Sequence, residues 1–119
     1  MSMTLEQRNA KLDEAKALIL NVGWTQDAYA RDIGDTEIEG DYIVACKDAA
    51  VCYCARGAVL AAAELPGDHD SQHPCIRALE AAVKLMPGNY RHVVAFNDAP
   101  TRTVDEVAAL FDKAKEMPL

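Results

Sequence analysis

The side chains of this chain with the greatest chemical potential are four cysteines, three histidines and several arginines. Cys54 could act as a nucleophile with His73 or His92 as its base, and Asp98 would then orient that base. A reactive thiolate needs an electropositive and partly exposed setting, whereas Cys54 lies in an alanine-rich apolar segment. Because burial raises the pKa of a thiol, the sequence favours a core cysteine and predicts no catalytic residue.

A metal site is the next chemistry to consider. His69 and His73 are four residues apart, and Cys75, with Cys52 as a further donor, could complete a zinc site. The two histidines lie in a segment rich in proline, glycine and aspartate, and the chain has no Cys-x-x-Cys pair. We therefore predict no metal and no cofactor.

Arg56 is the only charged residue in the apolar segment 49–63. Its guanidinium must extend to the surface along its own stem or pair with a carboxylate, and Asp32 and Asp98 are the expected partners. We favour this structural ion pair. The functional alternative is an anion site, in which Arg56, Arg102 and Arg31 converge on a phosphate or a carboxylate.

Trp24 is the only tryptophan, and it either plugs the core or joins Tyr29 and Tyr90 as the wall of a small-molecule pocket. Asn97 and Asp98 could fold their own loop, as such residues commonly do, or belong to that pocket. The candidate set for a pocket or an ion pair is therefore Trp24, Asp32, Cys54, Arg56, Asn97, Asp98 and Arg102.

Length and charge limit the classes of protein. The 119 residues, half of them hydrophobic, suit a single domain spanning 1–119. A net charge of -7, spread along the chain, argues against direct binding to nucleic acid and allows a basic protein partner. The N-terminus lacks a signal-peptide pattern, and no apolar run reaches the ~20 residues that span a bilayer. We expect a cytoplasmic protein with reduced cysteines and no membrane contact.

The elements that must position these residues are mostly helices. Thr4 and Thr103 are expected N-caps, and Pro74 suits a first helical position. The apolar spacing predicts helices over about 5–22, 25–33, 48–65, 74–86 and 103–117. Residues 35–42 read as a loop or a very short hairpin, and residues 90–96 are ambiguous between a helical turn and a strand.

The predicted fold is therefore predominantly all-α, a compact domain of four or five helices around the buried central helix 48–65, with room for one very short β element between 36 and 45. Asp48 would cap that central helix. Small residues at helical spacing, including Gly57, predict the close approach of a neighbouring helix. Gly57 itself costs about 1 kcal/mol in a helix interior, and close packing would offset this.

Three patterns resemble those of a known family: Trp24-Thr-x-x-Ala-x-Ala-x-Asp32, Cys54-x-x-Gly-Ala58, and Asn97-Asp followed by Arg102-Thr and Glu106-Val107. The family is one of small uncharacterised proteins, a domain of unknown function from bacteria, phages and prophages. The resemblance spans roughly residues 15–115. It implies a bacterial or viral origin, a place in the bacterial or host cytoplasm, and an accessory role acting on a host protein.

For function we expect a non-enzymatic binding or interaction module, with a protein partner or a second copy of the chain. The alternative is a small enzyme or ligand binder that uses the candidate set as its pocket.

Overall fold

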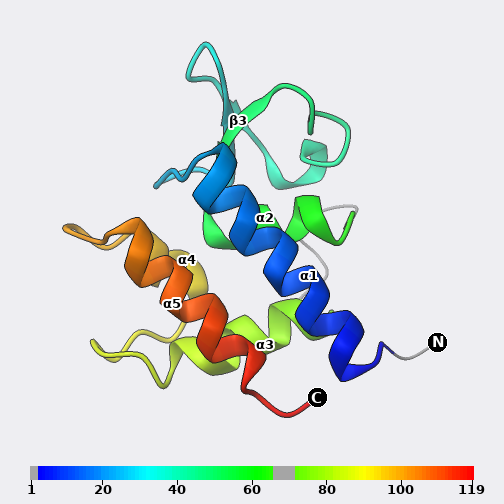
Figure 1. Ribbon diagram of the computed structural model, residues 1–119. Helices are drawn as coiled ribbons and strands as arrows, with labels where there is room; N and C mark the ends of the chain where they lie inside the picture. Colours follow the sequence, from blue (N-terminus) through cyan, green and yellow to red (C-terminus); the bar gives the residue numbers. More distant parts are fainter. Residues whose placement is uncertain (1–2, 66–71) are drawn as a thin grey trace.

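The computed structural model describes residues 3–65 and 72–119. It places a small sheet at one end of a group of helices (Figure 1). The sheet is antiparallel, with strand order β2-β1-β3. In chain order the elements are α1 (Leu5–Ala17), the π-helical turn η1 (Leu18–Val22), β1 (Ala30–Asp32), β2 (Glu37–Ile38), the 3-10 turn η2 (Gly40–Tyr42), β3 (Ala50–Tyr53), α2 (Ala55–Ala62), α3 (Pro74–Val83), α4 (Val93–Asn97) and α5 (Val104–Lys115).

The fold is mixed rather than all-α. The prediction of a compact, mainly helical fold is confirmed, and the short β element is present as β2, paired to β1 through Ala30↔Ile38 and Arg31↔Glu37. The prediction missed the other two strands. No helix of the described residues is long and apolar enough to cross a membrane.

Helix starts were the most predictable local features. Thr4 and Thr103 each form a capping box, in which the threonine hydroxyl accepts from the backbone of the third helical residue and that residue's side chain accepts in return. Pro74 occupies the first turn of α3, and His73 caps that helix by accepting from the Cys75 N–H. Residues 66–71 of the segment rich in proline, glycine and aspartate, which include His69, lie outside the described residues.

The central helix predicted over 48–65 is wrong in its first third. Residues 50–53 form β3, which pairs with β1 through Arg31↔Cys52, and α2 begins only after Cys54. A short apolar run fits a buried strand as well as a buried helix, so periodicity alone could not separate them. The expected cap at Asp48 therefore does not start the helix, and the extended Cys54 takes that position.

The short helix predicted over 25–33 is also wrong. Residues 30–32 form β1, and Asp27 has a positive φ of 67°, which interrupts any helix there. The backbone of this segment bonds to distant residues: Thr25 N–H donates to the Tyr53 carbonyl at 3.0 Å. Tertiary hydrogen bonds have overridden a weak local helical preference.

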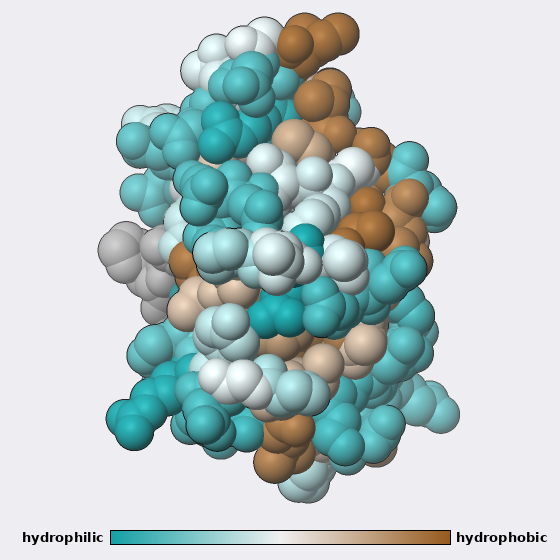
Figure 2. Space-filling view, turned by 90° about the vertical axis from the view of Figure 1, so that its left-hand side faces the viewer, coloured by the Kyte–Doolittle hydropathy of each residue, from teal (hydrophilic) through white to brown (hydrophobic). Residues whose placement is uncertain are grey.

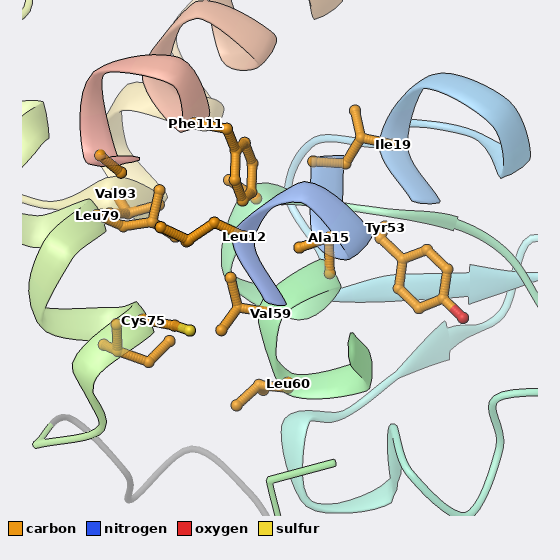
Figure 3. Packing of buried hydrophobic residues seen from close by; sticks show 14 of the residues in the cluster. Leu12, Ala15, Ile19, Tyr53, Val59, Leu60, Cys75, Leu79, Val93 and Phe111 are labelled. Carbon is orange, nitrogen blue, oxygen red and sulfur yellow. The ribbon is translucent and has the colours of Figure 1, made fainter. Parts of the chain in front are cut away.

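The core lies between α2 and the helices around it. Figure 3 shows Leu12 pointing from α1 toward Leu79 of α3 and Phe111 of α5, with Val59 of α2 below Leu12 and Tyr53 at the sheet end. All five side chains are at most 3% exposed. Burying side chains of this size supplies the main driving force for folding.

Arg8 is a charged residue inside this core that the sequence analysis overlooked. It is only 1% exposed, and its guanidinium donates to the carbonyls of Ala114, Lys115, Met117 and Pro118 at 2.7 to 3.3 Å. The Ala114 and Lys115 carbonyls end α5, where the helix dipole also favours a cation, and the other two belong to the tail. Arg8 thus ties the C-terminal tail to α1.

The surface at the sheet end carries exposed apolar side chains. In Figure 2 apolar atoms lie at the top of the molecule and along one edge, while the centre of that face is mostly hydrophilic or neutral. Leu20 and Val22 of η1 and Val51 of β3 are 42 to 49% exposed, and Ile33, in the turn after β1, is 92% exposed. These four side chains are called the apolar strip below.

Gly57 permits a contact that no other residue would. A Cβ there would lie 2.0 Å from the Tyr29 carbonyl oxygen, which accepts a hydrogen bond from Cys54 N–H at 2.9 Å. The predicted close approach is therefore correct at Gly57, but the neighbour is the backbone before β1 rather than a helix.

We expect Gly57→Ala to destabilise the fold by roughly 2 to 4 kcal/mol, although alanine is the better helix former, because the new methyl group collides with backbone. Urea unfolding measures the change. Gly34→Ala is the control, since its Cβ would meet only the side chains of Asp32 and Thr36, at 3.4 and 3.9 Å. A Gly57→Ala protein as stable as Gly34→Ala would contradict this packing.

Candidate functional site

The amide of Asn97 lies at the centre of the candidate set. Asn97 ends α4 and is fully buried. Its Oδ1 accepts from the Trp24 indole N–H at 2.8 Å and from Ala55 N–H at 3.0 Å. Its Nδ2 donates to the Thr25 carbonyl and to Asp98 Oδ1, both at 3.0 Å. Since every donor and acceptor position of this amide is used, it joins the 24–25 segment and the start of α2 to the end of α4.

The segment around Trp24 lies along the free edge of β3. Trp24 forms a parallel bridge with Tyr53, whose N–H donates to the Gly23 carbonyl at 2.9 Å. The Trp24 indole crosses from this edge to Asn97. Trp24 therefore acts as a structural link between the sheet edge and α4. This role is closer to the interpretation that Trp24 plugs the core than to the interpretation that it forms a pocket wall.

Gln26 and Asp98 hold the same segment to the turn after α4. Gln26 Nε2 donates to the carbonyls of Asn97 and Ala99 at 3.0 and 2.9 Å. Asp98 Oδ1 also accepts from Asp27 N–H at 2.9 Å. These bonds account for the loop geometry at Asp27, and they fix the Asp98 carboxylate in one orientation.

Cys54 has the environment of a structural thiol. It is 3% exposed, and its Sγ accepts from Gly57 N–H at 3.3 Å as the N-cap of α2. Burial raises the pKa of the thiol to about 12, the Gly57 hydrogen bond lowers it, and the nearby Asp98 charge raises it further. At neutral pH the sulfur therefore carries a proton and is a poor nucleophile.

Arg56 forms an ion pair with an acid that the sequence analysis did not consider. Its Nη1 lies 3.7 Å from Glu80 Oε2 of α3, and Glu80 Oε1 accepts from Val93 N–H at 2.8 Å at the start of α4. Arg56 is 9% exposed. The contact joins α2, α3 and α4, and it supports the structural ion pair over an anion site.

Arg102 is held by aromatic rings and backbone. Its guanidinium carbon lies 3.7 Å from the Phe96 ring centre and 5.2 Å from that of Tyr90, and its Nε donates to the Phe96 carbonyl at 2.7 Å. Its Nη1 also lies 3.2 Å from a Glu106 carboxylate oxygen. Stacking and hydrogen bonding of this kind fix a guanidinium firmly.

Six of the seven predicted residues thus divide into three groups, whereas Arg56 pairs with Glu80 apart from them. Trp24, Cys54, Asn97 and Asp98 lie together around the Asn97 amide. Arg102 reaches the same turn through the Phe96 carbonyl. Asp32 holds the β1–β2 turn by accepting from the N–H groups of Gly34 and Thr36. Arg31, the third cation of the proposed anion site, donates to Thr25 Oγ1 and lies 3.7 Å from an Asp35 carboxylate oxygen.

A cleft of about 670 Å³ opens next to this cluster. Residues 27–29 and 36–41 form most of its wall, and Cys54, Val94 and Asp98 complete it. The wall carries five carboxylates, and none of its described residues is a lysine, arginine or histidine. Ile38 and Val94 add apolar surface.

The described residues contain no group of three or more histidine, cysteine or acidic side chains that could hold a metal ion. Cys75 is buried, and burial raises the pKa of its thiol to about 11. Cys46 and Cys52 are partly exposed free thiols.

Sequence reasoning missed three structural side chains: Arg8, Gln26 and Glu80. Arg8 had a detectable signal, because it lies on the same helical face as Leu12 and Ala15, where an apolar residue is expected. Gln26 and Glu80 had none, since their partners are backbone groups or charges brought close only by the tertiary fold.

Comparison with known proteins agrees with the resemblance in the sequence. The model of one family, described as a family of unknown function (DUF6197), matches residues 3–117. No curated protein and no solved structure matches the chain.

Removing the Asn97 amide should leave the Trp24 indole, Ala55 N–H and Thr25 carbonyl without their partner. We expect Asn97→Ala to lower the free energy of unfolding by roughly 2 to 4 kcal/mol. Chemical denaturation measures this loss. Asn21→Ala is the control, because Asn21 is exposed on η1 and should change stability little. If the two variants change the free energy of unfolding equally, the hydrogen bonds of the Asn97 amide are not needed for stability.

The cysteines should differ in reactivity. In the folded protein at pH 8, we expect iodoacetamide to label Cys46 and Cys52 at least about 100-fold faster than Cys54, because Cys54 is buried and protonated. Mass mapping of peptides assigns the labelled sites, and denaturant should equalise the rates. Rapid labelling of Cys54 without denaturant would contradict its burial and would support Cys54 as a nucleophile.

Proposed function

The chain belongs to this family of unknown function, DUF6197, and we propose that it is a non-catalytic binding module whose acidic cleft receives a cationic segment of a partner protein. The observation that carries the proposal is the 670 Å³ cleft with five carboxylates on its wall. A cleft lined by one sign of charge focuses the electric field and attracts the opposite charge.

The wall has the two kinds of surface that a lysine or arginine side chain needs. Ile38 and Val94 offer apolar contact to an alkyl stem, and the carboxylates can meet its charged head. Asp98 is already oriented by Asp27 N–H and the Asn97 amide, so binding would cost little reorganisation there.

The state of the other candidates supports binding rather than catalysis. Cys54 is buried with a raised thiol pKa, and the Asn97 amide makes its hydrogen bonds to other groups of the fold. The small-enzyme alternative would need these groups to be available. A host protein as partner and a phage or prophage origin remain predictions from the resemblance, and a basic partner remains a prediction from the net charge of -7. The cytoplasmic location also remains a prediction.

The test measures binding of a peptide carrying about four lysines spaced by alanine, by calorimetry at low and physiological salt. We expect Glu37→Gln/Glu39→Gln to weaken binding at least about fivefold. Glu6→Gln/Glu116→Gln is the matched control, since it removes the same charge from exposed positions outside the cleft.

Two results would overturn the proposal. If both double variants weaken binding equally, the peptide responds to overall charge and the cleft has no special role. If the wild-type protein does not bind the peptide even at low salt, the cleft is not a cation receptor. Native mass spectrometry of the same samples reports whether the apolar strip at the sheet end instead pairs two copies.

A further inference from the structure

A second hollow, formed mainly by α1 and α3, has the opposite electrostatic character, and we propose that it is a docking groove for a short acidic amphipathic peptide segment. Its volume is about 1050 Å³. Residues of α1, the start of α3 and the tail 117–119 form its walls. It shares no lining residue with the acidic cleft, so this proposal does not depend on the proposed function.

The groove is lined largely by apolar and small side chains. Met3, Pro74 and Met117 supply the larger apolar surfaces, and Ala10, Ala78 and Ala81 leave space between the two helices. The short side chains of these alanines leave room for a larger apolar side chain from outside. A groove of this kind between helices is a common receptor for one or two apolar anchors of a peptide.

The third wall is held in place by Arg8. Its guanidinium donates to the Met117 carbonyl at 2.7 Å and to the Pro118 carbonyl at 3.2 Å, so the tail is tied to α1. Arg8 itself lines the groove while only 1% exposed. The groove is therefore largely formed before any partner binds, which reduces the entropic cost of docking.

The charges on the wall decide the chemistry of the partner. Lys11 lies on α1 and Arg77 on α3, so a cation stands on each helix. No aspartate or glutamate side chain belongs to the described lining. Lys11 has only an exposed pair with Glu14, and no ion pair of Arg77 is present among the described residues. An acidic segment would complement the two cations of this wall, although the chain as a whole has a net charge of -7.

The placement of the cations favours a peptide segment as the occupant, because one cation stands on each of the two helices that border the apolar lining. The volume of about 1050 Å³ lies at the upper end of the roughly 300 to 1,000 Å³ that ligand pockets hold. The expected segment places one or two leucine, methionine or phenylalanine side chains against the alanines. Aspartate or glutamate on either side of them would reach Lys11 and Arg77.

The test selects binders from a library of random peptides about 12 residues long, displayed on phage, against the wild-type protein. We expect enriched peptides to combine large apolar residues with aspartate or glutamate. The best peptide, made synthetically, should bind Lys11→Gln/Arg77→Gln about tenfold more weakly than wild type. It should bind the control Lys47→Gln/Lys84→Gln, which loses the same charge outside the groove, as wild type.

Amide shifts in NMR spectra locate the bound peptide, and circular dichroism confirms that each variant is folded. Shifts centred on Ala10, Arg77 and Ala81 support the proposal. Failure to enrich peptides, enrichment of basic ones, or equal binding to the two double variants would overturn it. If no peptide is selected and a fatty acid instead shifts the amide signals of Ala10, Arg77 and Ala81, the groove binds a lipid chain and the proposal is overturned.

Discussion

The hydrogen bonds of the Asn97 amide are the constraint on which the rest of the structure depends. One buried side chain fixes the Trp24 edge of the sheet, the start of α2 at Ala55, the Thr25 loop and the Asp98 carboxylate. A buried amide without these partners would cost several kcal/mol, so residues 24–25, the start of α2 and the end of α4 are placed together or not at all. The local geometry around it, including the Gly57 contact with the Tyr29 carbonyl, follows from that placement.

Charge is distributed in two ways within the molecule. Arg8, Arg56 and Arg102 are largely withdrawn from solvent and serve the fold through carbonyls, a carboxylate and aromatic rings, respectively. Other charges line the two hollows, with five carboxylates on the wall of the cleft and Lys11 and Arg77 on the walls of the groove. Under the two proposals above, these hollows of opposite sign would receive two different partners.

Sequence reasoning predicted the features that depend on neighbouring residues. The capping boxes at Thr4 and Thr103 and the start of α3 at Pro74 are local, and each is present. Strands β1 and β3 were missed because their pairing joins residues 30–32 to 50–53, and because α2, capped by Cys54, follows β3 directly. Four of the candidate residues lie around the Asn97 amide, but the partners of Arg56 and Trp24 could be seen only once the fold was known.

The most direct test of this account is hydrogen exchange at the single indole of the chain. Trp24 Nε1–H donates to Asn97 Oδ1, and its NMR signal is unique because there is only one tryptophan. If the Asn97 network opens only when the protein unfolds, this proton should exchange with the same opening free energy as the amide of buried Leu60. Exchange about 100-fold faster or more, independent of global stability, would show that the network opens locally and would contradict its central role.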